Sequence, residues 1–563
     1  MKLIPRLFFV LICCLLLSAC ISSVQNTGGG EESEGDPPEV VIGERLFIET
    51  RFAQFFKTHS SGNFNAPLAQ GDPVMDTTQT INGILPGPFK GQSMNCRACH
   101  LVDEQLSVMG GGMRTYDDFA RRSPIPERED GKIMTPRNSP PLVNSTLAHS
   151  GDLFLHFDGE FSTIEDLVHA TLTGRNYGWL PNEENQALQH IADVVRFDDG
   201  TGALAATTGG LSYQTILLGK DLGIPHEFLI PPEFRIDVAQ ASNEEIVAAV
   251  SRLVGAYVKS LIFSQGENGE FNGSPYDVFL KKNNLPAQPD PGESNLQYGR
   301  RLSQLVNSLS NPQFVSASDG AFQFHTQEFI FGPQELEGLK TFLREPTGTP
   351  LPPATLAQGK VGNCIACHAP PSFSDFKFHN TGVAQEEYDF IHGTGKFAAL
   401  SIPTLADRQA NPDAYLPASS QHPNASGIFV DVPSFDKPGH TDLGLWNRYA
   451  NADAPVSQAS LNQLLCQMFG NLVADCTPDN LLPLTIGLFK TPGLRDLGHS
   501  GPYMHNGEKD GLEDVIRHYI QFSNLSRAGQ MVNPPAELQG LALTEQDIQS
   551  VTAFLRALNE DYN

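Results

Sequence analysis

Apolar side chains recur every three to four residues in three stretches of the chain, which is the spacing of one buried helix face. The first stretch follows Ser162 and Glu165, two residues at the spacing of a capping box. The second covers residues 244–262, and the third follows Thr544 and Asp547, again at capping-box spacing. These patterns predict a mainly α-helical fold.

One pattern occurs twice. The stretch FDGEFSTIEDLVHAT at residues 157–171 and the stretch HNGEKDGLEDVIRHY at residues 505–519 share Gly-Glu, an aliphatic residue, and then Glu-Asp with two aliphatic residues, all in register. A His-Ser-Gly phrase precedes each stretch and begins at His149 and at His499. The repetition predicts two units related by duplication.

A Cys-x-x-Cys-His motif precedes each of these stretches, and the two motifs consist of Cys96, Cys99 and His100, and of Cys364, Cys367 and His368. This is the attachment signature of c-type haem, in which two thiols bond the haem and the histidine binds its iron. A structural zinc site would need four ligands close together, whereas these pairs lie far apart in the sequence. We therefore expect a dihaem cytochrome with two cytochrome c-like domains, and with His100 and His368 as proximal iron ligands.

The first 20 residues have a basic start and an apolar run that is too short to cross a bilayer, which is typical of an export signal. The signal ends in a phrase that resembles a bacterial lipobox, so that Cys20 would carry a lipid. An ordinary signal peptide cleaved nearby is the alternative. Residues 21–40 are polar and predict a flexible tether. Because Ile21 follows the cysteine, the motif resembles those of outer-membrane lipoproteins that face the periplasm of Gram-negative bacteria.

The composition of the 563 residues, 40% hydrophobic and 18% charged, indicates a folded globular protein. The formal net charge of −27 disfavours nucleic acid and suits basic protein partners, although an acidic surface selected for solubility gives the same charge. Of the nine cysteines, Cys13 and Cys14 lie in the signal and only Cys466 and Cys476 remain beside the haem and lipid motifs. In an oxidising compartment we expect these two to form one local disulfide.

Four further phrases accompany the haem motifs. They are GERLFIETRF from Gly43, TPRNSPPLVNS from Thr135, FHNTGV from Phe378 and FKTPGLRDLGHSGPYMHNG from Phe489. Together they resemble the bacterial dihaem cytochrome c peroxidase and MauG superfamily over most of the chain after residue 40. The resemblance implies an N-terminal cytochrome c-like domain at 41–285 with haem 1 and a C-terminal one at 286–563 with haem 2. It does not cover two long irregular insertions, at 200–235 and 404–477.

The resemblance also implies an oxidoreductase. Hydrogen peroxide or oxygen would be activated at haem 1, and electrons would pass through haem 2 from a donor cytochrome or a protein substrate. A calcium ion would lie between the haems, bound by Asn138 and by the carbonyls of Ser500 and Pro502. The alternative for Asn138 is that it only braces a turn.

Tyr519 is expected to bind the second iron on its distal side. In the superfamily this ligand lies fourteen residues beyond the histidine of the Pro-Tyr-x-His phrase, here His505, and it is methionine in many peroxidases and tyrosine in MauG. Helical periodicity places Tyr519 on one face with Leu512 and Ile516, whereas His518 points about 100° away. A tyrosine ligand stabilises oxidised iron. The alternative is a core tyrosine.

The equivalent residue of the first stretch is Thr171, which is too short to reach an iron. We therefore expect haem 1 to be open on its distal side, with Met109, Met113 and Tyr116 as remaining candidates for a ligand.

Two positions depart from the peroxidases of the superfamily. Asn176 aligns with their distal glutamate and cannot act as a carboxylate base, and Phe157 replaces the tryptophan between the haems. Glu160, Glu183 or His156 remain candidates to replace the glutamate. These departures disfavour fast peroxide reduction, so a non-enzymatic electron-transfer cytochrome and a dihaem oxygenase remain as alternatives.

Cys20→Ser should release the protein from membranes, because each buried lipid CH₂ group contributes about 0.8 kcal/mol. The measurement is sedimentation with membranes after a salt wash, with wild type as the bound reference. A Cys20→Ser protein that still sediments would contradict lipid anchoring.

Overall fold

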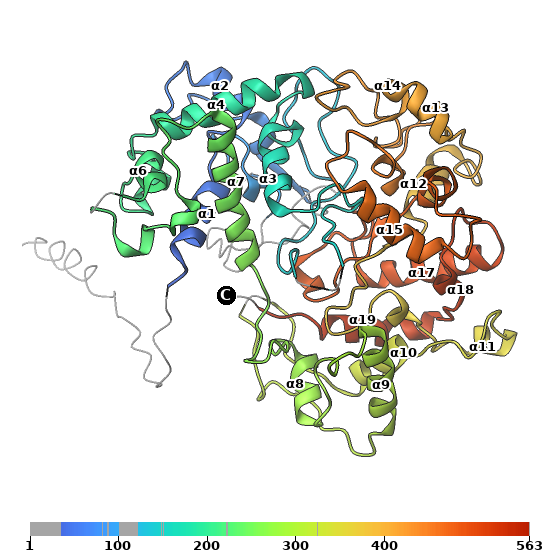
Figure 1. Cartoon of the computed structure of the whole chain (residues 1–563). Coiled ribbons are helices and arrows are strands. Elements are labelled where there is room, and N and C mark those ends of the chain that lie inside the picture. The colour runs from blue at the N-terminus through green and yellow to red at the C-terminus, as the bar shows by residue number, and fades with distance from the viewer. Residues whose placement is uncertain are drawn as a thin grey trace, which may run out of the picture. The chain divides into compact units, whose positions relative to one another are not determined.

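The computed structural model describes residues 35–80, 83–86, 89–100, 122–147, 149, 151–220, 223–323 and 325–561. Residues 38–563 form one compact unit (Figure 1). The predicted signal with Cys20, most of the predicted tether, and Met109, Met113 and Tyr116 lie outside the described residues. Within them, no helix combines the length and apolarity needed to cross a bilayer.

The fold is mainly α-helical, as predicted. The first part of the unit contains helices α1 (Pro38–Phe47), α2 (Gln54–His59), α3 (Ile164–Thr173), α4 (Glu184–Phe197), α5 (Ala203–Ala206), α6 (Tyr213–Leu218) and α7 (Asn243–Ser260). The second contains α8 (Pro275–Lys282), α9 (Asn295–Ser308), α10 (Pro333–Leu343), α11 (Pro353–Gln358), α12 (Val383–His392), α13 (Leu405–Ala410), α14 (Pro412–Tyr415), α15 (Gln458–Phe469), α16 (Pro478–Leu481), α17 (Leu512–Arg527), α18 (Ala536–Gln539) and α19 (Glu545–Arg556).

Two small antiparallel pairs of strands accompany the helices. β1 (Thr77–Thr80) pairs with β2 (Gly83–Pro86). β3 (Phe378–His379) pairs with β4 (Phe489–Lys490), so that Phe378 lies opposite Lys490. The second pair joins two of the phrases that carried the family resemblance.

The two repeated stretches form helices that begin at equivalent residues, Ile164 in α3 and Leu512 in α17. The cap of α3 differs from the prediction by one residue. Thr163, not Ser162, accepts a hydrogen bond from the backbone N–H of Asp166 at 3.1 Å, because Thr163 is the residue with extended backbone before the first turn. The predicted capping box of Thr544 and Asp547 is present at α19.

The buried apolar side chains form three main clusters. One lies among α1, α3, α4 and α7, and includes Tyr213 and Ile216 from the insertion at 200–235. A second lies among α9, α10, α17 and α19. The third belongs largely to the insertion at 404–477, where Trp446 and Leu461 are buried. A disulfide joins Cys466 to Cys476 in this insertion, with Cα atoms 5.5 Å apart.

Buried ion pairs connect the insertion at 404–477 to the first part of the chain. Asp158 is fully buried between two arginines, Arg137 at 2.7 Å and Arg448 at 2.7 Å. Arg137 also contacts Asp442 at 2.6 Å, and Arg448 contacts Glu160 at 2.9 Å. The two guanidinium groups hold the pKa of Asp158 well below its usual range, against the effect of burial.

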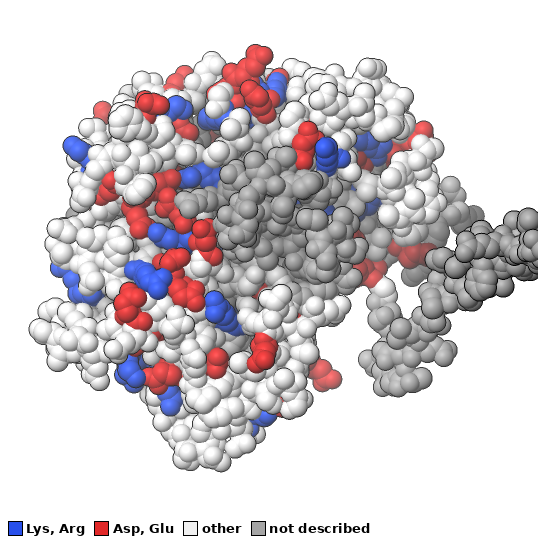
Figure 2. Space-filling view, turned by 180° about the vertical axis from the view of Figure 1, so that it is seen from behind, with Lys and Arg blue, Asp and Glu red and all other residues white. Residues whose placement is uncertain are grey.

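The surface differs from this interior in how its charges are arranged. On the face seen in Figure 2, acidic and basic side chains are interspersed rather than gathered into one patch of a single sign. The net negative charge is therefore not concentrated in a single patch on the described part of this face.

Asp158→Asn should lower the free energy of unfolding by about 3–5 kcal/mol, because it leaves two buried guanidinium groups with one fewer carboxylate. The measurement is urea denaturation of the haem-loaded protein. The matched control is Glu337→Gln, which breaks the exposed pair of Glu337 with Lys360 and should cost less than about 1 kcal/mol. Equal losses in the two variants would contradict a stabilising role for the buried network.

Candidate haem-binding sites

The first Cys-x-x-Cys-His motif forms a tight turn. Residues Cys96–Ala98 are a 3₁₀ helix capped by Asn95, whose side chain accepts a hydrogen bond from the backbone N–H of Ala98 at 3.0 Å. The backbone N–H of His100 donates to the carbonyl of Cys96 at 2.9 Å, and Nδ1 of His100 donates to the carbonyl of Pro140 at 3.1 Å. Burial lowers the pKa of His100 to about 4, so the imidazole is neutral at neutral pH.

The second motif is built in the same way. Residues Cys364–Ala366 form a 3₁₀ helix, and the N–H of His368 donates to the carbonyl of Cys364 at 2.7 Å. Nδ1 of His368 donates to the carbonyl of Phe373 at 2.9 Å, and burial lowers the pKa of His368. Because a carbonyl only accepts, Nδ1 carries the proton in both histidines, which leaves the lone pair on Nε2 for a metal.

Each motif opens on a cavity. His100 and Cys99 line a cavity of about 970 Å³, and Cys364, Cys367 and His368 line a second one of about 240 Å³. The four cysteines are free thiols. Burial raises the pKa of Cys96 to about 11 and that of Cys99 to about 12, so both are protonated. Two thiols, a neutral imidazole and a lined cavity fit a covalently attached haem c in each half.

Tyr519 lines the cavity that also holds His368, together with Leu512, Val515 and Ile516 of the same face of α17. Its hydroxyl has no hydrogen-bond partner among the described residues. Burial raises the pKa of Tyr519 well above its usual range.

The neighbouring His518 is also buried, but on another side of α17. Its Nδ1 lies 2.7 Å from a carboxylate oxygen of Glu386, and its Nε2 lies 2.8 Å from the carbonyl of Thr381. Both ring nitrogens are therefore engaged within the protein, and α17 has two buried sides rather than one.

Thr171, Asn176 and Phe157 line the larger cavity together with His100. Phe157 also lines the cavity of His368, so its ring lies where the two cavities adjoin. Of the candidates to replace the missing glutamate, His156 and Glu160 line the larger cavity and contact each other at 2.9 Å. Glu183 instead accepts hydrogen bonds from Arg128, and each of its carboxylate oxygens lies 2.8 Å from a guanidinium nitrogen.

No family model matches the chain. The chain is 28% identical to cytochrome-c peroxidase IdrP1 of Denitromonas iodatirespirans over 204 residues. These residues make up 36% of this chain and 38% of the relative. It is 39% identical over 71 residues to methylamine utilization protein MauG of Methylophilus methylotrophus, which covers 13% of this chain and 20% of that protein. The matches thus span less than half the length of these relatives.

Over these segments the chain is similar to cytochrome-c peroxidases and to MauG. Among solved structures, the dihaem peroxidase BthA of Burkholderia thailandensis E264 aligns with 94% of this chain and 87% of that chain, at 15% identity and a TM-score of 0.40. A MauG-like protein associated with microbial copper homeostasis aligns with 93% of this chain and 90% of that chain, at 16% identity and a TM-score of 0.39. These two alignments are too loose to carry an argument.

The three residues expected to bind calcium, Asn138, Ser500 and Pro502, line one cavity. The side-chain amide of Asn138 donates to the carbonyl of Pro502 at 2.7 Å, and its Oδ1 accepts from the N–H of Ser139 at 2.9 Å. Ser500 lines the same cavity as Asn138 and Pro502. The amide nitrogen and oxygen are assigned from their partners. With the amide turned over, Oδ1 and the carbonyl would offer the oxygen ligands that Ca²⁺ prefers.

Part of the larger cavity comes from residues that the sequence did not single out. Ser419, Arg448 and Asp453 of the insertion at 404–477 line it. The hydroxyl of Tyr177 lies 3.1 Å from Sγ of Cys96. No periodicity or motif marks these residues, because their contacts join segments far apart in the sequence.

Wild-type protein should carry two covalent haems, and Cys96→Ala with Cys99→Ala should remove one of them. The measurement is a quantitative pyridine haemochrome assay per mole of protein. The matched control is Cys466→Ala with Cys476→Ala, which removes the disulfide and should leave both haems attached. A single haem in the wild type would contradict the dihaem assignment.

Proposed function

We propose that the protein is a periplasmic dihaem c-type oxidoreductase that activates hydrogen peroxide, or oxygen, at the haem attached to Cys96 and Cys99. Electrons would pass through the haem attached to Cys364 and Cys367. The observation that carries this proposal is the difference between two equivalent positions. Thr171 lines the cavity of His100, whereas Tyr519 lines the cavity of His368. A threonine leaves room for a small oxidant, whereas a tyrosine can bind an iron.

The haem irons, when bound, supply the redox chemistry, and the chain positions them through His100 and His368. The carbonyls of Pro140 and Phe373 fix the tautomer of these histidines. The proposed role of Tyr519 is to bind the second iron, since its side chain lines the cavity of His368 and a phenolic oxygen can bind a haem iron.

Protons at the first site would be handled by His156 rather than by a glutamate. Asn176 cannot take a proton, and Arg448 holds Glu160 as a carboxylate at 2.9 Å. Glu160 in turn contacts Nδ1 of His156 at 2.9 Å, an arrangement in which a carboxylate orients an imidazole.

The remaining features belong to the same proposal. We infer two cytochrome c-like domains, at 41–285 and 286–563, that arose by duplication. Support comes from α3 and α17, which begin at equivalent residues of the repeated stretches. We also infer a Ca²⁺ ion held by Asn138, Ser500 and Pro502, a lipid anchor at Cys20 in the outer membrane, and a cytochrome or protein as electron donor.

An electron-transfer cytochrome without peroxidase activity is the second candidate, and Asn176 in place of a carboxylate favours it. Peroxide titration of the reduced holoprotein separates the two. Stoichiometric oxidation of both haems at a rate above that of the free reaction supports the oxidoreductase, whereas unreactive haems support the carrier.

Tyr519→Phe should leave both haems attached and convert the second haem from six-coordinate to five-coordinate. Its reduction potential should rise, because an oxygen ligand to ferric iron is lost. The measurement is electron paramagnetic resonance with a redox titration. Thr171→Ala is the matched control at the equivalent position and should leave the second haem unchanged. An unchanged spectrum in Tyr519→Phe, with an altered one in His518→Ala, would show that the ligand is His518.

A further inference from the structure

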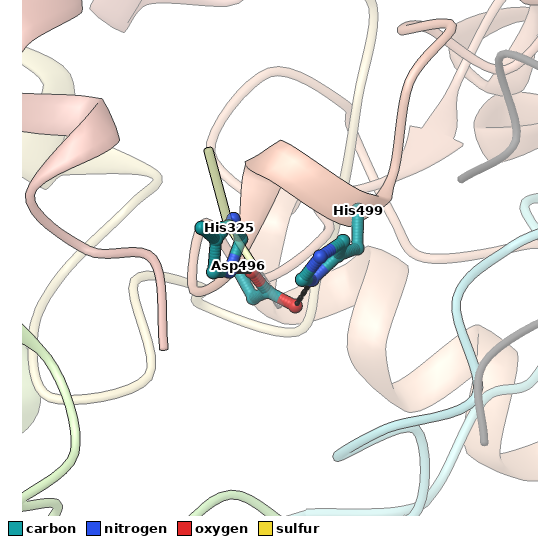
Figure 3. Close-up of side chains that lie close together, drawn as sticks. All are labelled: His325, Asp496 and His499. Atoms are coloured by element: carbon teal, nitrogen blue, oxygen red, sulfur yellow. Dashed lines mark hydrogen bonds and ion pairs between the residues drawn. The ribbon is translucent and has the colours of Figure 1, made fainter. Parts of the chain in front are cut away.

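Two histidines share one aspartate outside both haem motifs. Nδ1 of His499 lies 2.8 Å from Oδ2 of Asp496, and Nε2 of His325 lies 2.9 Å from Oδ1 (Figure 3). Asp496 and His499 belong to the short turn around the 3₁₀ helix Leu497–His499, and His325 comes from the loop before α10. One nitrogen or oxygen of each residue can be chosen so that the three atoms lie within 4.8 Å of one another.

The cluster is almost fully buried. The side chains of His325, Asp496 and His499 are only 5%, 4% and 7% exposed. Oδ1 of Asp496 makes no hydrogen bond with the described residues. Nε2 of His325 lies 2.9 Å from it but makes its hydrogen bond with the carbonyl of Glu560 at 3.3 Å. The two imidazole rings lie 3.8 Å apart between centroids. Burying a carboxylate oxygen without a hydrogen bond costs free energy, unless a cation lies in contact with it.

A second cluster in the protein provides the contrast. His156, Asp158 and Glu160 also group their ligand atoms, and Asp158 also has an oxygen without a hydrogen bond. There, however, Arg137 and Arg448 each form an ion pair with Asp158 at 2.7 Å. An orphaned oxygen alone therefore does not indicate a metal, and the position of the arginines distinguishes the two clusters.

No arginine or lysine pairs with Asp496 among the described residues. Its neighbour in the sequence, Arg495, is turned away and pairs with Asp277 at 2.9 Å and Glu560 at 3.0 Å. The cluster offers two imidazole nitrogens and one carboxylate oxygen as possible ligand atoms. Zinc and similar divalent transition metals prefer this set of ligands, whereas Ca²⁺ prefers oxygen alone.

We propose that His325, Asp496 and His499 bind one divalent transition-metal ion of the zinc class, in addition to the haem irons. Asp496 and His499 line a cavity of about 160 Å³, which His100 also lines, and this cavity provides a side from which water can complete the coordination. The ion would pin the loop of His325 to the turn that continues into Ser500 and Pro502.

The equivalent histidine of the first repeat has different neighbours, so the proposed site is specific to the second half of the chain. His149 opens the first His-Ser-Gly phrase as His499 opens the second, but His149 stacks on Phe376 at 3.9 Å between centroids and its Nδ1 contacts the carbonyl of Leu147 at 3.0 Å. It belongs to neither of the clusters of possible metal ligands found among the described residues. His149 is therefore a matched control for His499.

The test uses full-length holoprotein incubated with excess zinc sulfate and then freed of loosely held metal by gel filtration. Metal and iron are measured by inductively coupled plasma mass spectrometry. Wild type and His149→Ala should retain about one zinc per two irons, whereas His325→Ala and His499→Ala should lose it. Asp496→Asn should lose it as well. Asparagine tolerates the left-handed backbone of residue 496, with φ of +55°, so this variant keeps the turn.

X-ray absorption at the zinc edge supplies the second readout. Nitrogen and oxygen neighbours at about 2.0–2.2 Å with an imidazole signature support the site. Three outcomes would overturn it: wild type that retains no zinc above the Asp496→Asn protein, equal zinc in all variants, or a sulfur shell. The first would leave a hydrogen-bonded His-Asp-His cluster only.

Discussion

The fold around the haem motifs depends on one short segment, Asn138 to Pro140, that is bonded to both parts of the chain. The carbonyl of Pro140 accepts from Nδ1 of His100 at 3.1 Å and so fixes that imidazole. Two residues earlier, the backbone N–H of Asn138 donates to the carbonyl of His505 at 2.7 Å, and its side chain donates to Pro502. The orientation of the His100 imidazole is therefore set by a peptide that the other half of the protein holds in place.

Features that depend on neighbouring residues in the sequence could be predicted from the sequence. The Cys-x-x-Cys-His turns are local, because the backbone bond from His100 to Cys96 closes within five residues, and the motif alone specifies it. Helical periodicity likewise predicted that Tyr519 shares a face with Leu512 and Ile516, and all three line one cavity. The α3 cap was misplaced by one residue, because Ser162 and Thr163 both suit that role and only the backbone decides between them.

Contacts between distant segments could not be predicted in this way. Arg448 reaches Asp158 from an insertion without periodicity, and nothing in either local sequence indicates the partner. The periodicity of α17 also failed to show that His518 is buried. A polar residue away from the apolar face is expected to face solvent, and only the fold brings Glu386 and Thr381 into contact with it. Periodicity reports burial among apolar side chains, whereas polar burial depends on partners that only the fold supplies.

Buried carboxylates recur near the haem motifs, and the chain balances them in different ways. Asp158 lies between two arginines, so its charge is fixed and its neighbourhood is closed to a cation. Asp496 lies between two histidines, which can be neutral and can give up a nitrogen lone pair. Because arginine is always protonated and imidazole is not, the first arrangement can only stabilise a fixed contact. The second can accept a metal ion or a proton, and its chemistry therefore depends on what the surroundings supply.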